Sequence, residues 1–249
     1  MSGIVGLSKE AGKALMATPA NPADRIAQLI TYLRQGVPLA QIRLPHGPAG
    51  LTTEEVQDHQ RWRLIAGIAC VVSREGYAGT SVNKVCQEVN VSKKSFYEIF
   101  PGGLEDCFLA AFDSVSVVIG SLTASVDPNQ IDDLDQLLSG LLGRYLLLLE
   151  QASELTELLL IHNLGASPAI RQRRVAAFDA YAVMFRQIFD VARERGMPIA
   201  AIDDTAMIAL LAGINESCIR HIITTGGVSG LTSLTPALRQ TALRLLRTP

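Results

Sequence analysis

The amino-acid sequence predicts an all-α fold, with a three-helix region in the N-terminal half and a larger helical region after it. Apolar residues recur with helical spacing through most of the 249 residues, and strand-like alternation is almost absent. Gly, Pro and Asn or Asp residues interrupt this pattern where helices would begin and end. Hydrophobic residues make up 48% of the chain and charged residues 18%, which is typical of a soluble globular protein.

The helical pattern divides the chain into three expected regions. Residues 1–51 form an N-terminal extension that combines a patternless start, a helix at 22–35 and an arm rich in Pro and Gly. Residues 52–103 are expected to hold the three shorter helices, and residues 104–249 the longer ones. The later helices are expected at about 104–124, 131–150, 153–164, 168–195, 203–225 and 235–247.

The first helix of the 52–103 region has clear start and stop signals. Thr52 and Glu55 match a capping box, in which each side chain satisfies a free backbone amide of the first turn. The apolar spacing then continues to about Glu75. Gly76 follows, and glycine readily takes the left-handed conformation that ends a helix.

Two short helices joined by a tight turn are expected next. The first spans 82–89 and is capped by Thr80 or Ser81. Asn90 stands where the turn needs a positive φ, which Asn tolerates better than most residues. The second short helix spans 93–100. With the preceding helix as a brace, this arrangement is a helix-turn-helix.

The second short helix separates packing residues from outward-facing ones. Phe96, Ile99 and Phe100 have the spacing that packs a helix onto its neighbours. The polar residues left at its exposed N-terminal end are Ser92, which also caps the helix, Lys93, Lys94, Ser95 and Tyr97. Lysines attract phosphates and contact guanine, and hydroxyl groups bond phosphates or bases. In a helix-turn-helix, this end of the second helix enters the DNA major groove.

The stretch from Gly76 to Phe100 closely resembles the DNA-binding signature of the TetR family. The shared features are a Gly-aromatic pair, Thr-Ser-Val before the first short helix, Val-Ser after the turn, and a basic-x-Ser-aromatic-Tyr run with a terminal Phe. The resemblance covers about residues 54–108. It implies a homodimer that binds a palindromic double-stranded DNA operator and is released by a ligand.

By motif match, the resemblance places Thr80 and Ser81 at phosphate contacts, and Lys84 joins them as a DNA-binding candidate. Two positions depart from the family pattern. Asn90 replaces the usual turn Gly, and Pro101-Gly102-Gly103-Leu104 occupies the region where the family often has a phosphate-anchoring Lys. Other readings stay open: a solvated basic pair for the two lysines, simple capping for Thr80 and Ser81, and partial packing for Tyr97.

Residues 104–249 are expected to bind the ligand and to dimerise. A small apolar effector would contact Tyr145, Leu149, His162, Phe178 and Tyr181, although these side chains could instead simply fill the core. Helix 168–195 carries two apolar stripes, and helix 203–225 is similarly apolar. The family resemblance implies that these two helices pair across the dimer axis.

Several function classes lack support in the sequence. The four cysteines are isolated and are interpreted as free thiols, with a redox switch as the alternative. Neither a metal site, a cofactor nor a catalytic grouping is expected. No transmembrane span or secretory signal is expected, which places the protein in the cytoplasm.

The expected function is a ligand-responsive repressor, with two alternatives. One is an activator or a constitutive DNA-binding protein without a ligand, which a filled C-terminal core would favour. The other is a helical enzyme, which convergent polar groups with perturbed pKa values would favour. The net charge is −2, so any DNA-binding surface must be a local patch.

Overall fold

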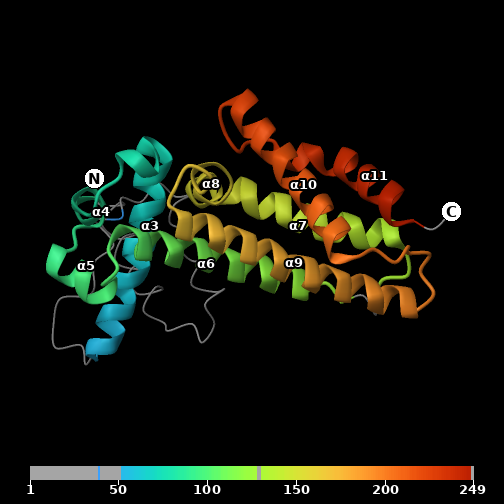
Figure 1. The fold of residues 1–249 in the computed structure, drawn as a ribbon, viewed down its shortest axis with the longest axis horizontal. Coiled ribbons are helices and arrows are strands. Elements are labelled where there is room, and N and C mark those ends of the chain that lie inside the picture. The colour runs from blue at the N-terminus through green and yellow to red at the C-terminus, as the bar shows by residue number, and fades with distance from the viewer. Residues whose placement is uncertain (1–38, 40–51, 128–129, 248–249) are drawn as a thin grey trace, which may run out of the picture. The chain divides into compact units, whose positions relative to one another are not determined.

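The computed structural model describes Leu39, residues 52–127 and residues 130–247, and these residues are almost entirely helical (Figure 1). Within them there is no strand, only an isolated bridge between Ile199 and Arg247. The prediction of an all-α fold is therefore confirmed. The helix expected at 22–35 and the Pro/Gly-rich arm lie outside the described residues.

The helices begin and end close to the expected residues. In chain order they are α3 (Thr53–Gly79), α4 (Val82–Val89), α5 (Lys93–Ile99), α6 (Leu104–Ala124), α7 (Leu134–Gln151), α8 (Ser153–Glu157), the π-helix η3 (Leu158–His162), α9 (Pro168–Glu194), α10 (Asp204–Thr225), the 3-10 helix η4 (Leu231–Leu234) and α11 (Thr235–Leu246). The main difference is at 153–164, where the expected single helix changes from α to π after one turn. π-helices are rare in proteins, and those that occur are often found at functional sites.

The chain folds into two compact units. The first contains the described residues up to Val118 together with Glu157–Ile170, and the second contains Ile119–Thr156 and Arg171–Pro249. These units divide the chain differently from the expected boundary at 103–104. The reason is packing, because Cys107 and Phe108 at the start of α6 are fully buried and Cys107 lies against the Leu64 carbonyl of α3.

The turn between α4 and α5 has the conformation that its sequence predicts. Asn90 has φ 52° and ψ 53°, which is the left-handed conformation. Its backbone N–H donates to the Cys86 and Gln87 carbonyls in the last turn of α4. Ser81 accepts a hydrogen bond from the Lys84 backbone N–H, and Ser92 accepts one from the Ser95 N–H. Both short helices are thus capped by hydroxyl groups. Gly76 has a positive φ of 71°, although the helical hydrogen bonds of α3 resume after it.

The core of the helix-turn-helix is aromatic and aliphatic. Phe96, Phe100 and Phe108 are fully buried, as are Leu64 and Ile65 on α3. The contact between α3 and α4 is close at Gly67, where a Cβ atom would lie 2.5 Å from a methyl carbon of Val89. Because glycine has no side chain, the two helices can approach each other at this position.

The second unit has its own apolar core. It is built from α7, α9, α10 and α11, with α7 and α11 in extensive contact. Fully or nearly fully buried members include Leu134, Leu137, Ala182, Met207 and Leu246. The turn before η4 is anchored to α7, because the Glu150 carboxylate accepts hydrogen bonds from the backbone N–H groups of Gly230 and Thr232, both at 3.0 Å.

Glu150→Gln is expected to lower the thermal stability of the protein in a pH-dependent way. The two backbone N–H groups lower the pKa of the Glu150 carboxyl below its ordinary value. The folded pKa is therefore below the unfolded one, which is about 4.3. The stabilisation by the Glu150 charge is therefore present above the unfolded pKa, about pH 4.3, and is lost as the pH falls through the lower, folded pKa. The melting-temperature difference between wild type and variant should be largest near neutral pH and shrink in acid.

Glu154→Gln, on α8, is the matched control for this experiment. It removes the same charge, but within the described part of the chain its side chain bonds only the neighbouring Ser153 hydroxyl. A pH dependence that is the same in both variants would contradict the anchoring role of Glu150.

Candidate nucleic-acid interface and ligand site

The helix α5 presents its polar residues outward and buries its aromatic ones. Phe96 and Phe100 are 0% exposed, whereas Tyr97 is 51% exposed. Lys93 and Lys94 are exposed at the first turn of the helix. Lys94 lies 3.8 Å from Glu98, with 87% of its side chain exposed, so this ion pair holds it only weakly. The surface separation predicted from the sequence is confirmed.

Hydroxyl groups organise the N-terminal end of α5. The Ser92 and Ser95 hydroxyl oxygens are 3.0 Å apart, and Ser92 also caps the helix. Ser92 is exposed and Ser95 is half-buried. The free backbone amides of this first turn carry a partial positive charge, which adds to the two lysines. The end of α5 is therefore suited to an anionic polymer.

The candidates before α4 are more engaged with their own chain. Thr80 is buried, and its hydroxyl donates to the Gly76 carbonyl at 2.7 Å. Lys84 forms an ion pair with Glu75 and donates to the Gly79 carbonyl at 2.8 Å. Ser81 is exposed and caps α4. Of the three candidates, Ser81 and Lys84 are exposed and Thr80 is buried.

The aromatic residues that pack around α5 also make a cation–π contact and a ring–ring contact that the sequence pattern does not predict. The Arg61 guanidinium lies 4.9 Å from the centre of the Phe100 ring. Tyr77 meets Phe108 edge-to-face at 5.2 Å. Such contacts add to the area burial of aromatic side chains. They link α3 to the C-terminal end of α5 and to α6.

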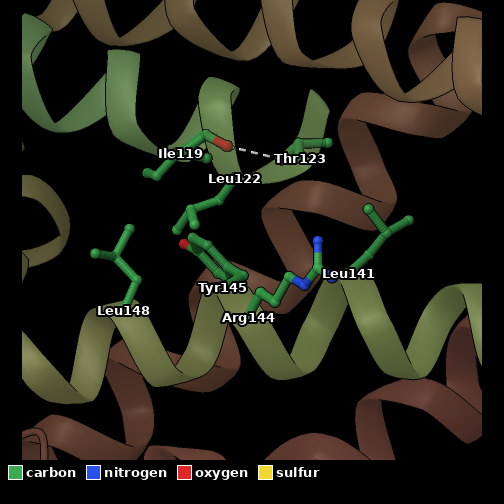
Figure 2. Close-up of a pocket in the computed structure, with 7 residues that line it drawn as sticks. All are labelled: Ile119, Leu122, Thr123, Leu141, Arg144, Tyr145 and Leu148. Carbon is green, nitrogen blue, oxygen red and sulfur yellow. Dashed lines mark hydrogen bonds between the residues drawn. The ribbon is translucent and has the colours of Figure 1, made fainter. Parts of the chain in front are cut away.

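A small pocket in the second unit lies between α6 and α7. Figure 2 shows side chains from both helices pointing into it, with Leu122 and Tyr145 facing each other. Its lining residues are Ile119, Leu122, Thr123, Leu141, Arg144, Tyr145 and Leu148. The cavity volume is about 10 Å³, which is roughly the space that one water molecule needs. Ligand pockets are roughly 300–1,000 Å³, so this one is small.

Tyr145 also belongs to a polar cluster among α7, α9 and α10. Its hydroxyl donates to the Asn215 side-chain oxygen at 2.5 Å. Burial raises the pKa of Tyr145 well above its ordinary value, and Cys218 and Tyr181 raise it further. Phe178, another expected ligand contact, stacks against Arg174, with 4.6 Å between the guanidinium carbon and the ring centre. The contacts of Tyr145, Phe178 and Tyr181 with a ligand stay predictions.

The two other expected ligand contacts lie elsewhere. Leu149 is almost fully buried in α7, and its carbonyl accepts the Thr156 hydroxyl at 2.8 Å. His162 belongs to the first unit, on η3, where its ring nitrogen lies 3.9 Å from the position of a Cβ on Gly76. Burial lowers the pKa of His162, against an opposing effect of Glu157. His162 is therefore positioned beside α3, and its contact with a ligand stays a prediction.

Arg174 and Asn215 were not among the predicted ligand contacts. Asn215 is a lone amide in an apolar helix, and Arg174 lies in the basic run 171–174, which reads as a solvated surface. Asn215 acquires its position from packing between α7 and α10, whereas Arg174 contacts Phe178, four residues along the same helix. Sequence spacing alone gives no signal for such a cluster.

The cysteines have the surroundings of structural thiols. Cys86, Cys107 and Cys218 are buried and Cys70 is half-buried, and among the described residues none of the four forms a disulfide. Burial raises the pKa of Cys218 to about 12 and that of Cys107 well above its usual value. A thiol with a raised pKa carries little thiolate and is a poor nucleophile.

Two described helices are long and apolar enough to cross a membrane, by length and composition alone. These are Leu104–Thr123, of which half of the apolar window is buried, and Asp204–Thr225, of which 28% is buried. The first has the burial of a core helix. The second packs Ile208, Leu210 and Leu211 against the core of its unit only in part and leaves Ile223 70% exposed, and an exposed apolar residue of this kind is also found in protein–protein interfaces.

Comparison with known proteins gives structural matches only. No family model and no curated protein matches the chain. The transcriptional regulator FadR from Bacillus subtilis, solved in complex with stearoyl-CoA, is 14% identical with a TM-score of 0.64, over 73% of this chain and 97% of that chain. A TetR-family regulator from Mesorhizobium loti is 20% identical with a TM-score of 0.61, over 80% of this chain and 100% of that chain.

A third structure agrees with these two. It is a TetR-family transcriptional regulator from Pectobacterium atrosepticum, 19% identical with a TM-score of 0.57, over 80% of this chain and 99% of that chain. The matches therefore extend over both compact units of the described chain. The chain has the fold of the TetR-family transcriptional regulators.

Proposed function

We propose that this chain is a cytoplasmic, ligand-responsive transcriptional repressor. It binds a palindromic DNA operator as a homodimer, and a small, largely apolar molecule releases it. The observation that carries the proposal is the helix α5, which exposes Lys93, Lys94 and Tyr97 above a buried aromatic base. This arrangement matches a recognition helix that inserts its N-terminal residues into the major groove. The shared fold with known regulators supports the same function.

The proposed dimer contact is formed by α9 and α10. Along α10, Ala209, Ala212, Gly213 and Ile223 are exposed on one face, and Ile223 is 70% exposed. A Cβ at Gly213 would meet no atom within 4 Å, so a second helix has room to approach there. On α9, Val175 is 63% exposed. Small and apolar residues at this spacing favour close helix–helix packing with a second copy of the chain.

The proposed release is a shift between two dimer states. Half-sites on one DNA face lie about 34–36 Å apart, so the two recognition helices must keep that separation. A ligand that binds better to a dimer with another spacing favours release. The segment Glu157–Ile170 offers a route for this coupling, because it packs on α3 through the Ser73–Glu157 hydrogen bond and continues directly into α9.

The effector class is proposed from the pocket and from one structural relative. FadR from Bacillus subtilis was solved with stearoyl-CoA, a molecule with a long acyl chain. The pocket beside Tyr145 is lined mainly by apolar side chains, which suits an aliphatic group. Its small volume favours the second candidate function, a DNA-binding regulator with no ligand. For an effector to be accommodated, the helices around the pocket must move apart.

Operator mapping with the purified protein on fragmented genomic DNA tests the proposed function. We expect enrichment of palindromic sites, two chains bound per duplex, and loss of binding when an acyl compound is added. Binding that no acyl compound weakens would favour the ligand-free regulator. No enrichment of any duplex sequence would contradict both functions.

A further inference from the structure

Arg63 is a buried cation on α3 that contacts the end of α4. It is only 9% exposed, although it lies in a part of α3 that is rich in charged residues. One guanidinium nitrogen, Nη2, donates to the carbonyl of Val89, the last residue of α4. The final carbonyls of a helix lack partners within the helix and carry a partial negative charge, which suits a guanidinium group. Arg63 therefore ties α3 to the turn that leads into α5.

The same nitrogen lies near the N-terminal extension. It is 3.5 Å from the carbonyl oxygen of Leu39, the residue of the extension that the structure describes. This distance is long for a hydrogen bond, so the contact alone would hold the segment only weakly. Leu39 is also 4% exposed, however, and burial of an apolar side chain is stabilising. Leu39 is thus seated in the protein, whereas a residue of a plain linker would lie on the surface.

The face of α3 that carries Arg63 is buried over two turns. His59 and Arg63 are four positions apart and share this face, and both are buried. Polar side chains of this kind are rarely buried unless other groups cover them. Gln57 and Arg61, on the opposite face of the same turns, are exposed. The first half of α3 therefore has one face in contact with protein, and Leu39 lies at that face.

The guanidinium of Arg63 joins the two contacts in one rigid group. A buried charge needs acceptors that replace water, and the Leu39 and Val89 carbonyls are acceptors of this kind. Asn90, in the left-handed conformation, follows Val89 directly, and α5 begins at Lys93. Loss of the Leu39 contact would let water reach the guanidinium and weaken its hold on this turn.

We propose that the N-terminal extension docks on the helix-turn-helix through Leu39, and that Arg63 couples this docking to the turn before α5. The partner of this surface is a segment of the same chain, anchored by an apolar side chain and a main-chain carbonyl. The docked extension positions the recognition helix, and this role needs no contact between the extension and DNA. The inference rests on the proposed DNA-binding function only for its effect on operator binding.

Hydrogen–deuterium exchange of the full chain without DNA, followed by mass spectrometry, tests the docking. In the wild type, amides around residue 39 should exchange more slowly than in a synthetic peptide of residues 36–44, because a docked segment is protected. Leu39→Ser should remove this protection and also speed exchange at the turn, residues 89–92. Leu164→Ser is the matched control, since Leu164 belongs to the same compact unit but is 51% exposed. The control should leave exchange in both regions unchanged.

Arg63→Met tests the coupling, because it keeps a long side chain but removes the donors. It should speed exchange at the turn, and adding Leu39→Ser to it should produce little further change there. Circular dichroism melting shows whether each variant folds, and Leu39→Ser alone decides the matter if Arg63→Met does not. Exchange around residue 39 as fast as in the free peptide, or a turn that Leu39→Ser leaves unchanged, would overturn the proposal.

Operator binding separates this inference from the proposed function. Leu39→Ser should weaken operator binding but keep the slope of log affinity against log salt, because it removes no phosphate contact. A protected extension in a protein that ignores duplex DNA would leave the docking in place and refute the proposed function. Operator binding by a protein whose extension is unprotected would refute the docking and leave the proposed function standing.

Discussion

Replacement of both Lys93 and Lys94 with Ala is expected to weaken operator binding on the order of 100-fold at low salt and to flatten its salt dependence. Both side chains project from the exposed first turn of α5, and no strong ion pair holds them. Each lysine that neutralises a phosphate releases counterions and contributes roughly 0.9 to the slope of log affinity against log salt. The variant should therefore lose up to about two units of slope for each half-site, measured by fluorescence anisotropy across a salt series.

The control for this experiment removes two positive charges outside the proposed interface. Arg244 and Arg247 are exposed at and just after the end of α11, in the second unit and outside the helices of the proposed dimer contact, and their replacement with Ala changes the net charge by the same amount. A general effect of protein charge would flatten the salt dependence equally in both double variants. A slope that the α5 variant leaves unchanged would exclude a phosphate role for the two lysines.

The local features of the helix-turn-helix could be predicted because short-range interactions determine them. The left-handed Asn90 and the Ser92 cap depend on residues that are adjacent in sequence. The division of α5 into buried Phe96 and exposed Tyr97 follows from helical spacing alone. These features need no knowledge of the rest of the chain, and the structure confirms each of them.

Features that depend on distant packing could not be predicted in the same way. Lys84 appears as a free basic residue in the sequence, yet Glu75, nine positions earlier, forms an ion pair with it. The polar cluster of Tyr145 and Asn215 joins residues seventy positions apart. Tyr145 could be proposed as a ligand contact from the sequence, but its partner Asn215 could not, because their contact depends on how α7 and α10 pack.

Phe96→Ala is expected to reduce the free energy of unfolding of the helix-turn-helix by roughly 3–5 kcal/mol, the cost of emptying a fully buried aromatic site. The Phe96 ring is 0% exposed and contacts both Tyr97 and Phe100, with ring centres 5.5 and 5.7 Å apart. Such a loss is a large share of the stability of a typical domain. Trp62 on α3 is the chain's single tryptophan, so its fluorescence during urea unfolding reports on this region.

Tyr97→Ala on the same helix separates folding from recognition. Because Tyr97 is 51% exposed, its removal should cost about 0.5–1.5 kcal/mol of stability, mainly through the lost contact with the Phe96 ring. Operator binding should nevertheless fall in both variants: in Phe96→Ala because α5 loses its support, and in Tyr97→Ala because the helix loses a contact with DNA. Size-exclusion chromatography with light scattering should show that Tyr97→Ala keeps the oligomeric state of the wild type. If Tyr97→Ala lowers the urea midpoint as much as Phe96→Ala does, Tyr97 is a packing residue, and recognition rests on the lysines and serines at the start of α5.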